Sequence, residues 1–457
     1  MRLASPWSPR LADRDGRPAD RLAFALEEDI HAGLLPGGAR LPAHRDLAYR
    51  LNIGLGSVTK AYQTLEARGL VASEQGRGMF VRIADASLSP PLDLSLNAPP
   101  QLISDQFLAS SLRKLARRLD AASFGAYVPP AGRPDHRAAK AGWLRQFGVP
   151  ATGATTLLTN GAQQALALCI GLAQQQGRAL LVEEVTYPGI IDLCHRHGVP
   201  LVPVATDADG PDPAALDGHL HRLAAAGQQA ALYLMPTLHN PTARSLPEER
   251  REALITLCRR YDAWIIEDEV YAPLADDALP PMVQRAPERV FYVGGLSKIV
   301  SPGLRMGWLV APPALVAAAE AILATSTTTA APLSSFLLVT WLEDGAADTL
   351  MATLKQEATE RRALARAILA DRLPQIGIGG FHLWLPCPLA EADRIALAAQ
   401  ARGLLLLPPR SFLPTEASPL AGVRVCLGPP PLAELERGLK LFKQIVTQSG
   451  PGRRAAV

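Results

Sequence analysis

Residues 261–308 read YDAWIIEDEVYAPLADDALPPMVQRAPERVFYVGGLSKIVSPGLRMGW, and this stretch carries most of the chemistry visible in the sequence. Ala263–Glu267 is a short apolar run, which predicts a strand buried on both faces of a parallel sheet. Asp268 would then lie at the carboxyl end of that strand, where open α/β sheets bind their ligands. A second apolar strand is predicted at Val290–Val293. The stretch therefore predicts an α/β fold with a ligand site at its strand ends.

A lysine follows the second predicted strand. Lys298 comes after the sequence GGLS at 294–297, so we expect it in a cleft and not on a solvated helix face. Burial near other cations lowers the pKa of a lysine, as an amine requires to form a Schiff base. Seven residues on, the turn SPG at 301–303 leads to Arg305, a fixed cation that can grip a phosphate through two parallel hydrogen bonds. Each residue alone is unremarkable, and only the combination carries the hypothesis.

The set Asp268, Tyr271, Lys298 and Arg305 resembles the fold-type I pyridoxal-phosphate (PLP) enzymes of the aspartate aminotransferase family. The resemblance implies that Asp268 pairs with the pyridinium nitrogen and that Tyr271 hydrogen-bonds the ring phenolate oxygen. It further implies that Lys298 forms the internal aldimine and that Arg305 holds the phosphate. A carboxylate keeps the ring nitrogen protonated so that the ring can act as an electron sink, and only a primary amine forms the imine.

Length and composition limit the classes of protein that fit. A chain of 457 residues is expected to form two or three domains, and 48% hydrophobic with 19% charged residues excludes a disordered protein. The net charge of +3 says little about nucleic acid. Five cysteines without a CxxC pair suggest reduced thiols in a cytoplasmic protein, with no disulfide framework and no metal site. We expect no signal peptide and no membrane span, because no long apolar run is present.

The N-terminal region contains a predicted helix-turn-helix. Residues 41–82 read LPAHRDLAYRLNIGLGSVTKAYQTLEARGLVASEQGRGMFVR, and a helical stripe over 20–32 precedes them. Helices are expected over about 43–51 and 56–67, joined by a turn at Gly54, and the second helix can lie in a DNA major groove. Strand-like runs over 70–73 and 79–83, joined by a tight turn, would complete a winged helix-turn-helix.

The motifs LPAHRDLA, SVTKAY, LEARGL and GRGMFV resemble the DNA-binding domain of the GntR family over Asp20–Ile83. The resemblance implies that Arg77 in the wing reaches a minor groove or a phosphate. Leu55 stands where these regulators usually carry an arginine, so their sequence preference does not transfer. The alternative is a helical hairpin used only for protein contacts. The side chains expected to face DNA are Arg45, Ser57, Thr59, Lys60 and Tyr62.

The chain is expected to divide after residue 83. Residues 84–91, ADASLSPP, are polar and proline-rich, which predicts a linker. Residues 92–448 alternate short apolar runs with helical patterns, typical of a mostly parallel sheet covered by helices. Residues 449–457 are expected to form a disordered tail. The expected fold class is therefore α/β, with an N-terminal winged helix-turn-helix (1–83) and a large PLP-dependent transferase domain.

Further parts of the aminotransferase pattern follow in order. Tyr127 in YVPPAG matches a tyrosine that reaches the phosphate of the partner subunit's cofactor, which implies a homodimer with shared sites. Gly161, Ala162 and Gln163 open a predicted helix, whose backbone N–H groups form a cradle for the PLP phosphate. Tyr187 matches the aromatic residue that stacks on the ring, with plain core packing as the alternative.

Two later motifs concern the ligand. Asn240, in a sequence close to the family's Asn-Pro-Thr-Gly signature, would hydrogen-bond the phenolate oxygen beside Tyr271. His239 before it could touch a ligand or simply hold the turn. Arg424 in GVRVCLG matches the arginine that binds the α-carboxylate of amino-acid substrates, with an ordinary surface arginine as the alternative.

Both halves together resemble the MocR subgroup of GntR-type regulators. The resemblance implies a transcription factor that senses an amine, an amino acid or PLP, the effector amine displacing Lys298 to form an external aldimine. It also implies a domain-swapped homodimer that reads repeated half-sites on DNA. An effector can switch such a protein only if it binds one domain arrangement better than the other. The alternatives are a working aminotransferase that carries a DNA-binding module and a PLP-free scaffold. We favour the regulator because the helix-turn-helix pattern is well formed.

Overall fold

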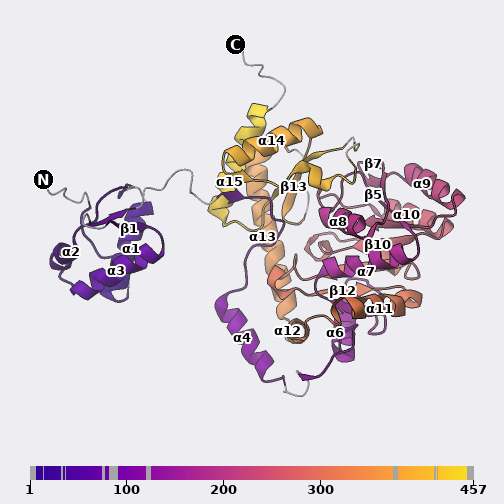
Figure 1. The fold of residues 1–457 in the computed structure, drawn as a ribbon, viewed down its shortest axis with the longest axis horizontal. Coiled ribbons are helices and arrows are strands. Elements are labelled where there is room, and N and C mark those ends of the chain that lie inside the picture. The colour runs from indigo at the N-terminus through magenta and orange to yellow at the C-terminus, as the bar shows by residue number, and fades with distance from the viewer. Residues whose placement is uncertain are drawn as a thin grey trace, which may run out of the picture. The chain divides into compact units, whose positions relative to one another are not determined.

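The computed structural model describes residues 7–13, 15–31, 34–36, 38–74, 78–81, 91–119, 125–373, 379–415, 418 and 420–449. Contacts divide the chain into two compact units, Met1–Pro91 and Leu92–Val457, and Figure 1 labels most of their helices and several of their strands. The first unit has one hydrophobic core, and the second unit has two. Most of the predicted linker, the predicted tail and Arg77 lie outside the described residues.

The first unit is a winged helix-turn-helix. Its helices are α1 (Pro18–His31), α2 (His44–Leu51) and α3 (Leu55–Ala67), and its wing pairs β1 (Val71–Glu74) with β2 (Gly78–Val81) in antiparallel register. These elements lie within two residues of the predicted helix and strand starts.

The tight turn between α2 and α3 follows from its sequence. Asn52 ends α2 in the left-handed conformation at φ 50° and returns its backbone N–H to the carbonyls of Ala48 and Tyr49. Asparagine tolerates this conformation better than most residues do. Helix α3 then buries one stripe against α1, at positions spaced three and four residues apart. That stripe consists of Val58, Ala61, Tyr62 and Leu65.

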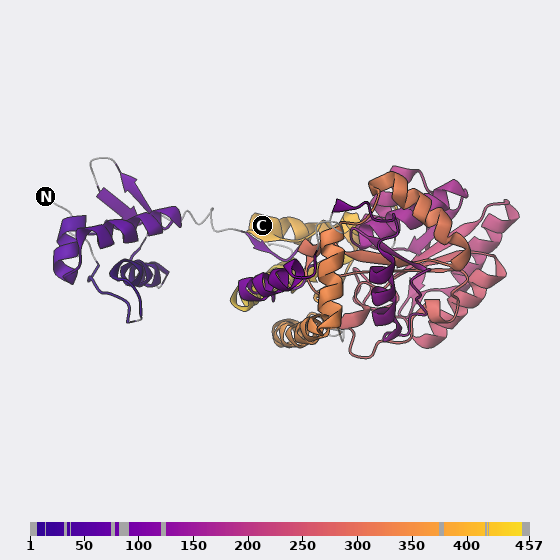
Figure 2. The same ribbon diagram turned by 90° about the horizontal axis from the view of Figure 1, so that it is seen from below.

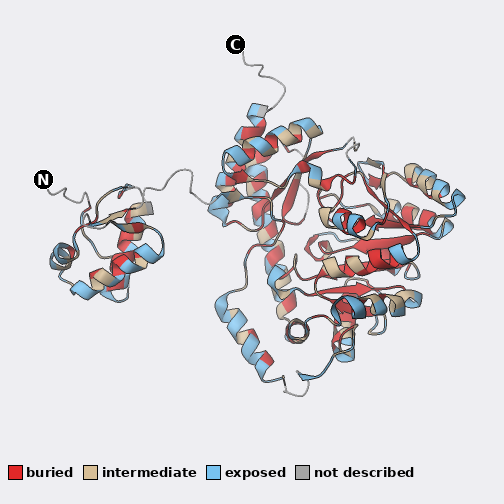
Figure 3. Cartoon of the chain, in the orientation of Figure 1, coloured by how far each residue is buried: buried red, intermediate tan, exposed pale blue. Residues whose placement is uncertain are grey.

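The second unit is built on a seven-stranded sheet with the order β4-β12-β11-β10-β9-β5-β6. Only β12 runs against its neighbours β11 and β4, so the prediction of a mostly parallel sheet is confirmed. Figure 3 shows the strands of this sheet as largely buried, as expected for a sheet covered on both faces, and the edge strand β6 is half-buried over its first three residues. The strands are β4 (Thr156–Thr159), β5 (Ala179–Glu183), β6 (Leu201–Val204), β9 (Ala230–Leu234), β10 (Trp264–Asp268), β11 (Val290–Gly295) and β12 (Gly307–Val310).

Helices pack around this sheet, as the two perpendicular views in Figures 1 and 2 show. Glycine, proline and capping residues set several of their ends; for example, Asp212 caps one helix by accepting from the N–H groups of Ala214 and Ala215. The helices of this region are α6 (Pro134–Arg145), α7 (Ala162–Gln175), α8 (Pro188–His197), α9 (Pro213–Ala225), α10 (Glu248–Arg260), α11 (Val316–Thr327) and α12 (Pro332–Glu343). Helix α4 (Asp105–Ala116) lies away from the sheet and packs on α12 (Figure 1).

The C-terminal part of this unit has a second core of its own. Here β13 (His382–Pro386) pairs with β15 (Gly422–Cys426) in antiparallel register. Strand β3 (Leu92–Asp93), the first element of the unit, runs parallel to β14 (Leu404–Leu405). The helices of this part are α13 (Ala346–Leu369), α14 (Leu389–Ala401) and α15 (Leu432–Ser449), and a small ribbon elsewhere pairs β7 (Thr206–Asp207) with β8 (Gly210–Pro211).

Two further observations concern the described residues. None of their helices is both long enough and apolar enough to cross a membrane. All five cysteines are free thiols, and the described His, Cys, Asp and Glu residues form no cluster that could hold a metal ion.

Candidate functional site

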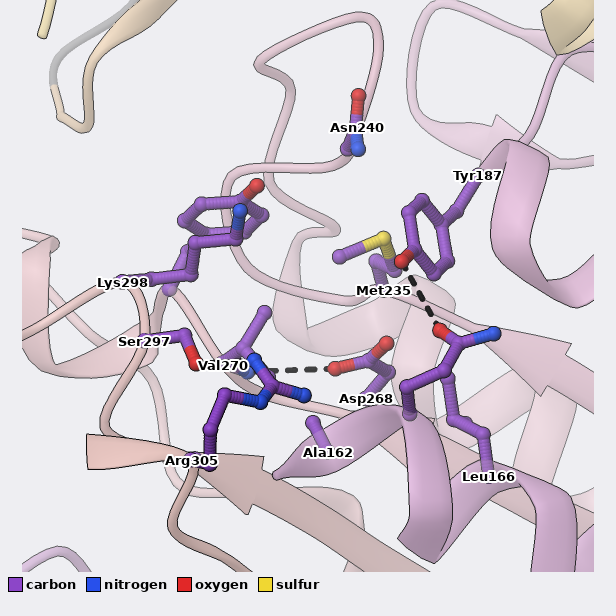
Figure 4. A pocket seen from close by; sticks show the side chains of 13 residues that line it. Ala162, Leu166, Tyr187, Met235, Asn240, Asp268, Val270, Ser297, Lys298 and Arg305 are labelled. Carbon is purple, nitrogen blue, oxygen red and sulfur yellow. Dashed lines mark hydrogen bonds between the residues drawn. The ribbon is translucent and has the colours of Figure 1, made fainter. Parts of the chain in front are cut away.

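A cavity of about 200 Å³ lies at the carboxyl ends of the central strands of the second unit. Figure 4 shows side chains from β10, from α7 and from the loop after β11 around it. This is the edge at which α/β sheets bind ligands. The lining residues are Ala162, Gln163, Leu166, Tyr187, Met235, Asn240, Asp268, Val270, Tyr271, Gly295, Ser297, Lys298 and Arg305.

Lys298 reaches the cavity from the loop that follows β11. Its Nζ atom donates a hydrogen bond to the backbone carbonyl of Asn97. Burial lowers the pKa of Lys298 to about 8, and the positive charges of Arg424 and Arg305 act in the same direction. An amine with this pKa has a substantial neutral, nucleophilic fraction near neutral pH.

Asp268 is the last residue of β10 and is buried. Its Oδ2 atom accepts a hydrogen bond from the Tyr233 hydroxyl at 3.0 Å. Burial raises the pKa of Asp268 to about 6, while the Tyr233 hydrogen bond works against that rise. Its Oδ1 atom accepts from the backbone N–H of Val270 at 3.4 Å, as Figure 4 shows. A buried carboxylate with these partners can take a cationic ring nitrogen as a further one.

The N-terminus of α7 and Arg305 together form an anion cradle. Gly161 precedes α7 and has a φ of +89°. It lies so close to Arg305 that a β-carbon at this position would be 2.8 Å from the Arg305 Nη2 atom. Arg305 Nη2 donates to the carbonyl of Asn160 at 3.3 Å. The first N–H groups of a helix have no intrahelical acceptors, so they and the guanidinium can share one phosphate. The donors present therefore fit the phosphate of PLP.

The polar side chains on the other side of the cavity are linked in pairs. The Tyr187 hydroxyl donates to Gln163 Oε1 at 2.9 Å. Arg424 Nη1 donates to Asn240 Oδ1 at 2.8 Å, and its Nε atom has no hydrogen-bond partner. Arg424 is buried in β15, so the alternative of an ordinary surface arginine is wrong. Arg424 is not among the residues that line the cavity, and it is connected to the cavity through Asn240, which does line it.

His239 holds the turn before Asn240 and does not line the cavity. Its Nε2 atom lies 2.8 Å from Glu183 Oε2, and its Nδ1 atom lies 2.8 Å from the Thr242 hydroxyl. Both ring nitrogens are therefore engaged with the protein, which supports the structural alternative for this residue.

Helix α3 of the first unit presents a polar face. Arg45 on α2 and Lys60 on α3 are exposed, and Ser57 and Thr59 are half-buried. The prediction that Tyr62 faces DNA is wrong: its side chain is fully buried, and its hydroxyl donates to the carbonyl of Pro42 at 2.8 Å. Tyr62 belongs to the buried stripe of α3, and its ring contacts the ring of His44.

Comparison with known families agrees with both units. Residues 89–440 match the family model for aminotransferase class I and II. The chain belongs to that family. Residues 18–81 match the model for bacterial regulatory proteins of the gntR family. The aminotransferase-family chain thus carries a GntR helix-turn-helix, the architecture of the MocR subgroup of transcriptional regulators.

Similar curated proteins cover nearly the whole chain. The HTH-type transcriptional regulator YdeF of Bacillus subtilis, itself uncharacterized, is 27% identical over 96% of each chain. The pyridoxine biosynthesis regulator PdxR of Corynebacterium glutamicum is 27% identical over 84% of this chain and 86% of its own. The regulator TauR of Rhodobacter capsulatus is 29% identical over 86% of this chain and 89% of its own.

Solved structures show the same fold. An archaeal alanine:glyoxylate aminotransferase has a TM-score of 0.72 at 21% identity, covering 86% of this chain and 95% of its own. LysN, an α-aminoadipate aminotransferase of Thermus thermophilus, has a TM-score of 0.70 at 22% identity, covering 79% of this chain and 93% of its own.

The aminotransferase pattern left some site residues unpredicted. Tyr233, which bonds Asp268, sits in the fully buried strand β9, where a lone hydroxyl in an apolar run was an available signal. Asn97 contacts Lys298 and Tyr271. It lies about 170 to 200 residues away from them in sequence, and nothing local marked it.

Tyr127 is not part of the cavity of its own chain. Its side chain is 96% exposed. The expectation that it reaches a partner subunit's cofactor stays a prediction.

Proposed function

We propose that this chain is a DNA-binding transcriptional regulator that holds PLP at Lys298 and responds to an amine, an amino acid or PLP itself. The observation that carries the proposal is the cavity around Lys298, where an amine with a lowered pKa, a buried carboxylate and an anion cradle converge. The same chain carries a GntR helix-turn-helix.

Each part of the cavity has a role towards PLP. Arg305 and the N-terminus of α7, from Gly161 to Gln163, would hold the phosphate, and Asp268 would face the ring nitrogen. Tyr271 and Asn240 would donate to the phenolate oxygen, and Tyr187 would stack on the ring. When bound, the cofactor supplies an aldehyde that condenses reversibly with primary amines. Lys298 is the amine of the protein for that condensation.

The effector is proposed to carry a carboxylate as well as an amine. Arg424 is buried, and a hydrogen bond of 2.8 Å to Asn240, a residue that lines the cavity, orients it. A guanidinium held in this way binds a planar carboxylate through two parallel hydrogen bonds. Among the relatives, the pyridoxine biosynthesis regulator PdxR supports the alternative that PLP itself is the signal.

The proposed assembly is a domain-swapped homodimer on repeated DNA half-sites. Tyr127 is almost fully exposed in the single chain, as expected of a side chain that completes the site of a partner. Two copies would place two α3 helices on one duplex, so the DNA site would contain two half-sites.

The rival function is a working aminotransferase, since the same residues serve transamination. The test that separates the two is multiple turnover with an amino donor and a keto-acid acceptor. A regulator is expected to stop within about one turnover per site, whereas an enzyme reaches rates of about 1 s⁻¹ or more.

The deciding experiment records the absorbance of the purified protein between about 300 and 500 nm, a window in which PLP bound to an amine absorbs. We expect a cofactor band in the wild type and in Lys440→Ala, an exposed lysine on α15, but not in Lys298→Ala. Amines that shift the band are then tested for an effect on binding to a duplex selected by the wild type from random-sequence DNA. A wild-type protein that shows no band after incubation with PLP would contradict the proposal.

A further inference from the structure

Leu55, the first residue of α3, is an apolar side chain at the surface of the first unit. The two apolar residues before it, Leu51 and Ile53, pack against the core of the unit. Leu55, in contrast, is 46% exposed. The buried stripe of α3 begins only three residues later, at Val58. Leu55 therefore presents its side chain to solvent at the start of the helix.

The residues on either side of Leu55 are glycines. Gly54 is the N-cap of α3 and makes no side-chain hydrogen bond to the helix. At Gly56, even an added β-carbon would have no atom of the described residues within 4 Å, apart from those of its chain neighbours and its own helix backbone. Leu55 is thus the only side chain of residues 54–56. A flat surface can approach it without meeting a side chain from either neighbour.

Thr59 lies one turn further along α3, on the same side of the helix as Leu55. Its hydroxyl donates to the backbone carbonyl of Leu55 at 3.1 Å. Because that proton is used within the helix, Thr59 offers a partner its methyl group and an oxygen that can only accept. The start of α3 therefore presents two neighbouring side chains that carry apolar groups and have no hydrogen-bond donor to spare.

Exposed cations lie on the same two helices. Arg45 and Arg50 on α2 and Lys60 on α3 are exposed. Lysine and arginine side chains at such positions bind the phosphates of a duplex and fix its orientation, without reading its sequence. The partner that fits α2 and α3 together is thus polyanionic and also presents an apolar group.

The position of Leu55 in the motif indicates which part of the duplex it meets. The first unit matches the gntR family, and α3 is the second helix of its helix-turn-helix. Such a helix contacts base edges in the major groove with its N-terminal residues. Thymine is the one base that displays an apolar group there, its 5-methyl group. An apolar side chain set against the other base edges would displace their water without replacing the hydrogen bonds.

We propose that Leu55, with Thr59 beside it, reads the 5-methyl group of a thymine in the major groove. Each half-site of the DNA should then carry a thymine at the position that the start of α3 contacts. The cations supply affinity that does not depend on sequence, and Leu55 supplies the preference. This inference rests on the DNA-binding part of the proposed function and specifies the base that the first unit selects.

The experiment compares two forms of the duplex that the full-length wild type selects from random-sequence DNA. One form keeps its thymines. In the other, deoxyuridine replaces them, which removes the 5-methyl groups and leaves the pairing with adenine intact. Fluorescence anisotropy at one salt concentration gives the affinity for each form. For the wild type, we expect the loss of each methyl group covered by Leu55 to weaken binding about fourfold, or about 15-fold over two half-sites.

Two leucine variants show whether this loss acts through Leu55. Leu55→Ala should bind the thymine duplex more weakly than the wild type, and deoxyuridine should weaken its binding by less than about twofold. Leu397→Ala, at an exposed leucine on α14 of the second unit, is the matched control and should show the full wild-type loss. Circular dichroism checks that both variants fold.

The outcomes separate this inference from the function on which it rests. A wild type that selects no DNA sequence would remove the DNA-binding part of the proposed function and the inference with it. A wild type that binds both forms of its selected duplex equally well would remove the inference alone. A folded Leu55→Ala that loses as much affinity as the wild type would do the same, because the methyl groups would then act through another contact or through DNA shape.

Leu55→Arg tests the same position by a gain of preference, and it decides even if Leu55→Ala does not fold. An arginine pairs with the O6 and N7 atoms of guanine in the major groove. Selection from random-sequence DNA with Leu55→Arg should therefore return guanine where the wild type returns thymine. A selected site that keeps thymine at that position would overturn the role of Leu55.

Discussion

Helix α3 and strand β10 expose their functional residues in opposite ways. In α3, apolar residues at helical spacing are buried, and Lys60 is left on the solvent side. In β10, all five residues are buried, and Asp268 becomes available only because the strand ends beside a cavity. The functional residues of a surface helix can be predicted from the periodicity of its apolar residues. Those of a buried strand can be predicted only from the position at which the strand ends.

The same contrast exists within β10. Glu267 and Asp268 are neighbours that point to opposite faces of the sheet. Glu267 accepts hydrogen bonds from the backbone N–H groups of Met282 at 2.6 Å and Val283 at 2.9 Å. Asp268 instead accepts from the Tyr233 hydroxyl and lines the cavity. The first carboxylate anchors a loop, and the second faces the ligand.

The largest expected effect distinguishes the two neighbouring carboxylates of β10. Asp268→Asn should weaken PLP binding at least about 30-fold, because the loss of one partner of a buried charge pair costs about 2 kcal/mol or more. The measurement is a PLP titration followed by absorbance. Glu267→Gln is the matched control and should keep PLP affinity while lowering stability. Similar PLP affinities for both variants would show that Asp268 does not face the ring nitrogen.

The second prediction uses the pKa of Lys298. Burial lowers this pKa to about 8. The fraction of Lys298 in the neutral amine form therefore rises with pH, and nearly all of it should be neutral above about pH 9. The rate of PLP capture by the cofactor-free protein should therefore rise about tenfold between pH 7 and 9 and then level off. Stopped-flow absorbance measures this rate. A rate that still climbs about tenfold between pH 8 and 9 would show an unperturbed lysine.

A smaller effect is expected on the polar face of α3. Lys60→Ala should weaken binding to the selected duplex about fivefold and reduce the slope of log K against log salt by about 0.9, as the loss of one phosphate contact does. Fluorescence anisotropy at several salt concentrations measures both. Arg17→Ala, an exposed arginine before α1, is the control. Equal losses in the two variants would indicate only a general effect of charge.

The smallest effect concerns the buried side of α3. Tyr62→Phe removes the hydrogen bond to the Pro42 carbonyl and should lower the free energy of unfolding of the first unit by about 1 kcal/mol. DNA affinity should stay unchanged, because the hydroxyl faces the core. Urea denaturation followed by circular dichroism, alongside anisotropy, checks both. Weaker DNA binding with an unchanged free energy of unfolding would indicate that the Tyr62 hydroxyl contacts DNA.

Most of the cavity could be predicted from sequence, and the reasons differ by residue. Asp268 and Lys298 were found because strand ends and glycine turns are local signals, and both line the cavity. Tyr62 was misplaced because a motif was given more weight than the spacing of buried residues in the same helix. Arg424 had only a weak motif, and its burial beside Asn240 appeared once β15 was placed.

The sequence by itself determined the two units, the mostly parallel sheet and most of the polar residues that line the cavity. These follow from periodicity, turn residues and motif order, which act over a few neighbouring positions. Only the tertiary structure decided that Asn97 and Ser95 hold Lys298 and Arg424. Those contacts join residues about 200 and 330 positions apart, and backbone carbonyls, which every residue has, carry no mark in a sequence.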